Sequence, residues 1–130
     1  MSKIIHSKQA PEFPLPFSQG IRAGDFVYVS GQVGVNPQTR EVVGNTVEEQ
    51  TVQTLRNIET ILAADGLTLD HVVKVTAFVS HLEDFPAYNR SYETVFKAPF
   101  PTRSSIQVGI GSYLVEIEAI AYVHSKRGEA

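Results

Sequence analysis

The chain has 130 residues, of which 42% are hydrophobic and 19% are charged, and its 11 basic and 14 acidic residues give a net charge of −3. This length suits a single domain spanning residues 1–130, and the composition is that of a globular protein rather than a disordered one. Cysteine is absent, which excludes a thiol nucleophile, disulfide bonds and cysteine-ligated metal centres.

The distribution of charge and hydropathy narrows the classes of partner. Basic residues are scattered and form no stripe interleaved with aromatic residues, so the sequence disfavours a nucleic-acid partner. The histidines at positions 6, 71, 81 and 124 show no ligand spacing, so no metal site is predicted. No segment approaches the roughly 18 apolar residues of a membrane span, and the N-terminus lacks the apolar stretch of an export signal. We therefore expect a cytoplasmic protein.

The first half of the chain predicts strand followed by helix. Prolines between positions 11 and 16 indicate an irregular N-terminal segment. Alternation of side chains over residues 25–31 predicts a strand, and residues 37–40 have the composition of a turn. The segment Thr46-Val47-Glu48-Glu49 has the form of a capping box and predicts the start of a helix, which Gly66 ends. Its apolar stripe contains Val52, Leu55, Ile58 and Leu62.

The second half adds one more helix between strands. Residues 72–80 alternate as a strand does, and a second helix is predicted from Phe85, with Asp84 as its cap and an apolar stripe reaching Phe96. Two further strands are predicted over about residues 102–110 and 114–124. This order of elements predicts an α+β domain of two layers, with a mixed sheet and two helices on one of its faces.

Alternation also divides the predicted strands between two faces. One set is uniformly aliphatic and is predicted to pack under the helices: Val27, Val29, Val73, Val75, Ala77, Val79, Ile106, Val108, Ile110, Val115, Ile117, Ala119, Ala121 and Val123. The other set is mixed: Phe26, Tyr28, Ser30, Lys74, Thr76, Phe78, Arg103, Ser105, Gln107, Glu116, Glu118, Ile120 and Tyr122. Because two helices cannot cover both faces, the apolar members of the second set predict self-association.

Arg103 is the single charged residue between positions 98 and 115. A guanidinium in such a stretch needs a partner, and its planar fork can hold a carboxylate through two parallel hydrogen bonds. One interpretation is a structural ion pair with Glu116 or Glu118. Two glutamates in a strand are also more often part of a solvated edge than of a site. The other interpretation is that Arg103 grips a carboxylate substrate while a glutamate, whose pKa partial burial would raise, handles water.

Several segments resemble the RidA (YjgF) family between about Pro14 and Ala121. They are Ser30-Gly31-Gln32, Asn36-Pro37, Thr54-Leu55-Arg56-Asn57-Ile58, Val73 to Val79, Tyr88-Asn89-Arg90-Ser91-Tyr92, Phe100-Pro101-Thr102-Arg103-Ser104 and Val115 to Ala121. The resemblance implies a chorismate-mutase-like α+β fold and a homotrimer with an active site in each inter-subunit cleft. It also implies hydrolysis of enamine and imine intermediates to 2-keto acids and ammonia without a cofactor.

The resemblance also assigns residues. Arg103 matches the arginine that binds the substrate carboxylate, and Glu116 the residue that positions the hydrolytic water. Ser30, Gly31 and Asn89 match pocket positions, and Ser105 matches a position, often cysteine, whose backbone faces the substrate. Phe17 stands where the family commonly has tyrosine, and the segment between Arg103 and Glu116 is about two residues shorter than usual. Both departures bear on the identity of the substrate more than on the class of reaction.

Two other functions fit the same resemblance. One is a binding or regulatory trimer in which Arg103 holds a metabolite carboxylate without turnover. The other is the ribonuclease or translation-inhibitory activity of some family members, which the acidic chain and scattered basic residues disfavour.

Overall fold

The computed structural model describes residues 2–129 as one six-stranded sheet covered by two helices. In chain order the elements are β1 (Ser2–Ile5), β2 (Gly20–Ala23), β3 (Phe26–Val33), α1 (Val47–Ala63), η1 (Leu69–His71), β4 (Val72–Val79), η2 (Leu82–Asp84), α2 (Phe85–Val95), β5 (Thr102–Gln107) and β6 (Val115–Tyr122). The sheet order is β1-β2-β3-β6-β4-β5. β4 and β5 are parallel and the other neighbours antiparallel.

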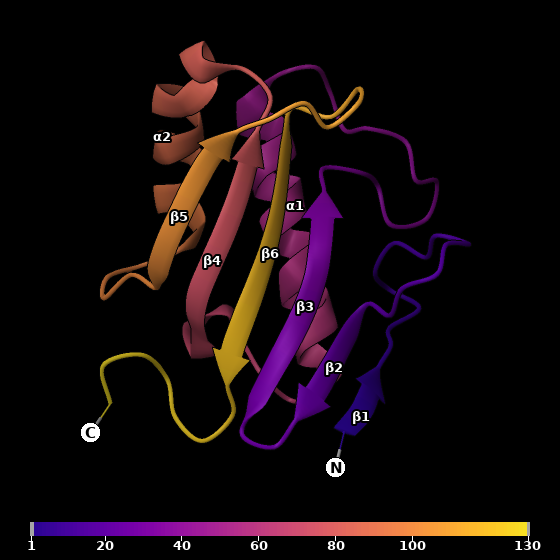
Figure 1. The fold of residues 1–130 in the computed structure, drawn as a ribbon, viewed down its shortest axis with the longest axis vertical. Coiled ribbons are helices and arrows are strands. Elements are labelled where there is room, and N and C mark those ends of the chain that lie inside the picture. The colour runs from indigo at the N-terminus through magenta and orange to yellow at the C-terminus, as the bar shows by residue number, and fades with distance from the viewer. Residues whose placement is uncertain (1, 130) are drawn as a thin grey trace.

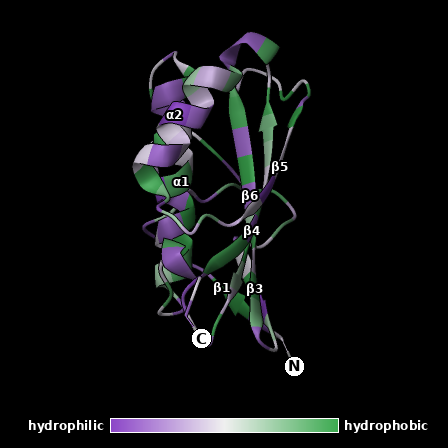
Figure 2. Cartoon of the chain, turned by 90° about the vertical axis from the view of Figure 1, so that its left-hand side faces the viewer, coloured by the Kyte–Doolittle hydropathy of each residue, from purple (hydrophilic) through white to green (hydrophobic). Residues whose placement is uncertain are grey.

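The two helices lie in one layer against one face of the sheet, and the opposite face carries no helix (Figures 1 and 2). This arrangement confirms the predicted α+β fold with a mixed sheet and both helices on one side. None of the described helices combines the length and the apolar content needed to cross a membrane.

Helix α1 forms as its sequence predicts. The Thr46 hydroxyl accepts a hydrogen bond from the Glu49 backbone N–H at 3.2 Å, and this bond satisfies one of the free donors of the first turn. Leu55, Ile58 and Leu62 are fully buried against the sheet. The chain leaves the helix through Gly66, whose φ of 75° favours glycine.

Helix α2 begins at Phe85 as predicted, but the predicted side-chain cap is wrong. Asp84 is the N-cap residue, yet its side chain makes no capping hydrogen bond. The short helix η2 runs directly into α2, so Asp84 already has helical backbone angles and its carboxylate is not directed at the free N–H groups. The face of α2 toward the sheet is aromatic, with Tyr88, Tyr92 and Phe96 buried.

The N-terminal part contains two strands that the sequence did not predict. β1 pairs with β2, and β2 pairs with β3, so the sheet extends beyond the expected strands. Each has only four residues, too few for alternation to be recognised, and a proline-containing segment separates them. The predicted turn at residues 37–40 is confirmed, since Asn36 Oδ1 accepts from the backbone N–H groups of Gln38 and Thr39.

The assignment of β5 to faces was wrong. The parallel register pairs Val75 with Arg103 and Ala77 with Ser105, so these two polar residues lie on the helix face. Ile106 is 48% exposed and Val108 39% exposed, where both were predicted to be buried. The prediction treated aliphatic residues as core residues, but β5 is an edge strand and needs no continuous aliphatic face. The strand ends at Gln107 rather than near Ile110.

A second correction concerns the start of β4. The register with β6 shifts between Val72 and Lys74, so Val72 is fully buried and Val73 is only half-buried. The aliphatic assignments on β3, on the rest of β4 and on most of β6 are confirmed. Their buried members are Val27, Val29, Val75, Ala77, Val79, Val115, Ile117, Ala119 and Ala121.

Candidate active site

Arg103 rests on two tyrosine rings of α2. Its guanidinium carbon lies 5.1 Å from the Tyr88 ring centroid and 4.8 Å from the Tyr92 ring centroid, which is the range of a cation–π interaction. Within residues 2–129 no aspartate or glutamate forms an ion pair with it. The proposed structural pair with Glu116 or Glu118 is therefore wrong.

A cleft of about 410 Å³ opens beside the guanidinium. Its lining residues are Asn89, Tyr92, Glu93, Phe100, Pro101 and Arg103. Asn89 lines the same cleft, and its Oδ1 is buried without a hydrogen-bond partner in the part of the chain that the structure describes. This first cleft therefore contains an exposed cation that has no acidic partner among residues 2–129.

Ser105 lies on the same face of β5 as Arg103 and forms a hydrogen bond with helix α2. The Ser105 hydroxyl is 2.9 Å from the Tyr88 hydroxyl. Burial raises the pKa values of both Tyr88 and Tyr92, so neither ring becomes a phenolate near neutral pH. Two neutral rings hold the guanidinium in place without neutralising it, and its charge stays available to an anion.

A second cleft, of about 380 Å³, surrounds Glu116 on the helix-free face. Its lining residues are Phe13, Leu15, Phe17, Ser30, Gly31, Val33, Tyr113 and Glu116. Burial, and then the negative charge of Glu118, raise the pKa of the Glu116 carboxyl above 4.5. A carboxylate made more basic in this way is suited to accept a proton from water.

A β-bulge brings Ser30 and Gly31 to this carboxylate. Val29 pairs with Ala119 and Gln32 with Ile117, so Ser30 and Gly31 together face Glu118 alone. The Ser30 hydroxyl donates to the Ser18 carbonyl oxygen at 2.5 Å, which fixes the bulge to the N-terminal segment. Strict alternation would direct Gly31 toward the helices, whereas a Cβ at Gly31 would lie 3.1 Å from Glu116 Cδ and 3.2 Å from Cγ.

Gly31→Ala is expected to displace the Glu116 carboxylate and to lower kcat for any reaction that uses this carboxylate by about tenfold or more, because small misplacements of catalytic groups are costly. The obstructing atoms belong to the end of a flexible side chain, so the melting temperature should change little. Steady-state kinetics and thermal melts of one preparation check both expectations. Wild-type kcat in the folded variant would show that the position of Glu116 does not control the reaction.

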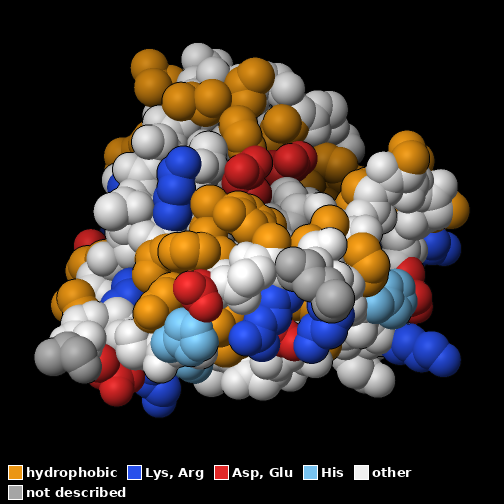
Figure 3. Space-filling model, turned by 60° about the horizontal axis from the view of Figure 1, so that its bottom comes forward, with side chains coloured by type: hydrophobic (Ala, Val, Ile, Leu, Met, Phe, Trp, Pro, Cys, Tyr) orange, Lys and Arg blue, Asp and Glu red, His pale blue; other side chains and the backbone are white. Residues whose placement is uncertain are grey.

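The residues predicted from the sequence fall into two groups that one chain does not bring together. Asn89, Arg103 and Ser105 lie on α2 and on the helix face of β5, while Phe17, Ser30, Gly31 and Glu116 lie around β3 and β6 on the other face. β4 separates β5 from β6 in the sheet. In Figure 3 acidic side chains lie among apolar ones in the central and upper part of the surface.

Comparison with known proteins places the chain in a family. The model described as Endoribonuclease L-PSP matches residues 7–123. A RutC family protein of Saccharolobus solfataricus is 40% identical over 123 residues, 93% of this chain and 98% of that protein. A 2-iminobutanoate/2-iminopropanoate deaminase of Dermatophagoides farinae is 36% identical over 93% of this chain and 96% of its own length. The chain belongs to the RidA/YjgF family.

A solved structure of this RidA/YjgF family agrees with the fold. The structure of Escherichia coli TdcF with bound serine superposes with a TM-score of 0.86, at 38% identity, over 92% of this chain and 98% of that one. All the candidate residues lie within the matched span 7–123. The final residues, among them Arg127, lie beyond it.

Sequence reasoning missed the role of the tyrosines. The sequence marks Tyr88 and Tyr92 only as part of the apolar stripe that reaches Phe96 and of a segment that resembles the family, whereas the structure shows that both rings contact Arg103. Their spacing of four residues places both rings on one face of the helix, and a cation on the facing strand is the signal that could have revealed the contact. That signal requires the correct face of β5, which was assigned wrongly.

Proposed function

We propose that this protein hydrolyses 2-imino acids to 2-keto acids and ammonia, at sites shared between the subunits of a homotrimer. The observation that supports this most is the division of the site: Arg103 has no acidic partner among residues 2–129 and faces one cleft, while Glu116 faces another. The Arg103 cleft binds the substrate carboxylate, and the Glu116 cleft supplies the proton acceptor. In each complete site, one of these clefts belongs to one subunit and the other cleft to its neighbour.

The reaction requires binding, orientation and one proton acceptor. Arg103 holds the substrate carboxylate through two parallel hydrogen bonds, which fixes the adjacent imine carbon against a water molecule beside Glu116. With the imine nitrogen protonated, Glu116 accepts a proton as the water oxygen bonds to that carbon, and the electron pair of the C=N double bond moves to the nitrogen. Glu116 then gives this proton to the nitrogen. As the C–N bond breaks, the new hydroxyl group loses its proton to the Glu116 carboxylate, so ammonia leaves and the carbonyl group forms.

The Glu116 cleft suggests the class of substrate. Phe17 is 47% exposed and offers no hydroxyl, and Phe13 and Leu15 lie in the same cleft. These side chains form an apolar wall beside the catalytic carboxylate, and an apolar wall favours an apolar substituent. We propose that small alkyl 2-imino acids, such as 2-iminopropanoate and 2-iminobutanoate, are preferred.

Assembly into a closed ring would join the two clefts. In such a ring one surface of each subunit contacts a different surface of the next. The helix-free face exposes Phe26, Tyr28 and Ile106 to 38%, 47% and 48%, an apolar area of the kind that subunit contacts cover. Sedimentation equilibrium should give a mass three times the 14.3 kDa of one chain. A stable monomer with full activity would refute the shared site.

The function is tested by coupling the protein to an amino-acid oxidase that releases an alkyl 2-imino acid. We expect keto acid and ammonia to form faster than by spontaneous hydrolysis of the imine, with rate proportional to protein concentration. A protein that binds 2-oxobutanoate but never accelerates imine decay would be a binding trimer. Degradation of RNA without acceleration of imine decay would favour the ribonuclease alternative.

A further inference from the structure

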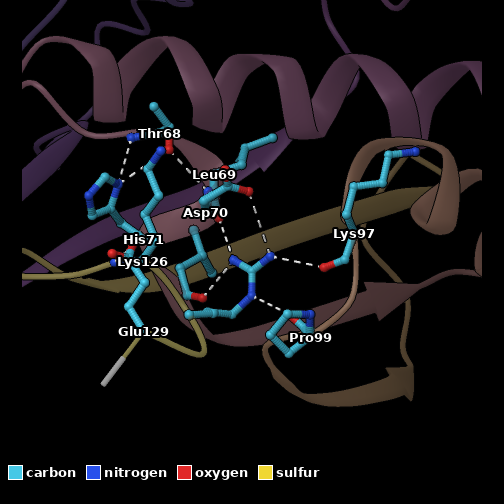
Figure 4. A network of polar contacts seen from close by, with 10 residues as sticks. Thr68, Leu69, Asp70, His71, Lys97, Pro99, Lys126 and Glu129 are labelled. Atoms are coloured by element: carbon cyan, nitrogen blue, oxygen red, sulfur yellow. Dashed lines mark hydrogen bonds and ion pairs between the residues drawn. The ribbon is translucent and has the colours of Figure 1, made fainter.

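The guanidinium of Arg127 is buried in a ring of backbone carbonyl groups. Its side chain is 7% exposed. Nε donates to the Pro99 oxygen at 2.6 Å, Nη1 to the Leu69 oxygen at 2.6 Å and the Val72 oxygen at 3.0 Å, and Nη2 to the Lys97 oxygen at 3.2 Å. Figure 4 draws this network, which ties the C-terminal segment to η1, to the start of β4 and to the loop after α2.

A column of aromatic rings joins Arg127 to Arg103. The Arg127 guanidinium lies 5.4 Å from the Phe96 ring centroid. The Phe96 and Tyr92 rings are 4.8 Å apart, and Tyr92 is the ring that lies 4.8 Å from the Arg103 guanidinium. Two neighbouring rings, tilted by 36° to one another, therefore each contact one cation, so a shift of one cation can be passed to the support of the other.

The same guanidinium fixes the loop that forms the Arg103 cleft. The carbonyl groups of Lys97 and Pro99 that it binds lie in the loop between α2 and β5. The next two residues, Phe100 and Pro101, line the cleft, and β5 begins immediately after them. Arg127 thus constrains both the wall of the cleft and the start of the strand that carries Arg103.

We propose that Arg127 is a positioning residue for Arg103, acting through Phe96 and Tyr92 and through the loop of residues 97–101. This rests on the proposed function in one respect, namely that the ligand of Arg103 is the carboxylate of a 2-imino or 2-keto acid. A purely structural role would stabilise the C-terminal segment and leave carboxylate binding unaffected. The two roles differ in what they predict for ligand affinity.

Arg127→Lys keeps the charge but replaces the fork that reaches four carbonyl groups with a single ammonium. We expect the dissociation constant for 2-oxobutanoate, measured by calorimetry, and KM for the imino acid each to rise about tenfold, with kcat within about twofold of wild type. Arg22→Lys is the matched control. Arg22 lies on β2, and its guanidinium forms an ion pair with the Asp65 carboxylate at 3.3 Å. The melting temperature of this variant should fall without a change in either constant.

A folded Arg127→Lys protein that binds 2-oxobutanoate as wild type does would overturn the proposal. If that variant does not fold, Phe96→Leu tests the proposal in the same way, because it removes one of the two rings between the cations and leaves the Arg127 side chain in place. Binding of the keto acid separates this inference from the function. If wild-type protein binds 2-oxobutanoate without accelerating imine decay, the proposed enzymatic function is refuted. The role of Arg127 can still be tested in that case, through the affinity of the variants for 2-oxobutanoate.

Discussion

Arg103→Lys is expected to lower kcat/KM for 2-imino acid hydrolysis by about a hundredfold or more. Lysine keeps the positive charge but loses the planar fork that holds a carboxylate bidentately, so the reacting carbon is no longer fixed against the water, and a misplacement of about 1 Å costs on the order of a hundredfold. The measurement is initial rate against imine concentration for both proteins.

The Arg103→Lys variant should still fold. Arg103 is exposed and makes no ion pair within residues 2–129, and a lysine over Tyr92 keeps part of a cation–π interaction that contributes only about 0.5–1 kcal/mol at exposed sites. We expect the melting temperature to change by less than about 5 °C. Arg56→Lys, on the exposed side of α1 beside Glu59, is the control for kinetics. A folded variant with near-normal kcat/KM would refute the role of Arg103.

Glu116→Gln is expected to reduce kcat by roughly a hundredfold to ten-thousandfold, the usual contribution of a positioned general base. The amide has the same shape and still forms hydrogen bonds, but it cannot accept the proton of the attacking water. Glu59→Gln, on the exposed side of α1, should leave kcat unchanged. Wild-type kcat in Glu116→Gln would show that another group activates the water.

The raised pKa of Glu116 has two consequences for pH dependence. Only the carboxylate form accepts a proton, so wild-type activity should fall on acidification at a pH above the ordinary 4.5, and Glu116→Gln should lack this acid limb. The folded-state pKa is above the unfolded one, so the contribution of this group to stability is largest below the unfolded pKa and is lost as pH rises through the folded pKa. Glu116→Gln should therefore be at least as stable as wild type at neutral pH.

The fold was predictable because most of its elements carry strong local signals. The Thr46 cap and the stripe through Leu55 and Ile58 define α1, and alternation in β3, β4 and β6 identifies the face under the helices. β1 and β2 were not predictable, since four residues are too few to establish a period of two. The faces of β5 were predicted wrongly because its one aliphatic residue, Ile106, lies on the exposed face.

The roles of the candidate site residues stay predictions, and their arrangement in space could not be predicted from the sequence. Arg103 and Glu116 were assigned to the same face, where an ion pair between them was a reasonable interpretation. The parallel register of β5 with β4 places them on opposite faces, and register of this kind depends on tertiary pairing rather than on local sequence. The bulge at Ser30 and Gly31, which brings Gly31 to Glu116, is likewise a property of the pairing between β3 and β6.

If each site combines Arg103 of one subunit with Glu116 of the next, two inactive variants should complement one another when they are mixed. Arg103→Lys and Glu116→Gln chains are unfolded, combined in equal amounts and refolded together. In a ring of three, every mixed trimer holds one site with both residues intact, so random assembly should restore about a quarter of the activity of wild type refolded in the same way. Activity that stays at the level of the separately refolded variants would contradict the shared site.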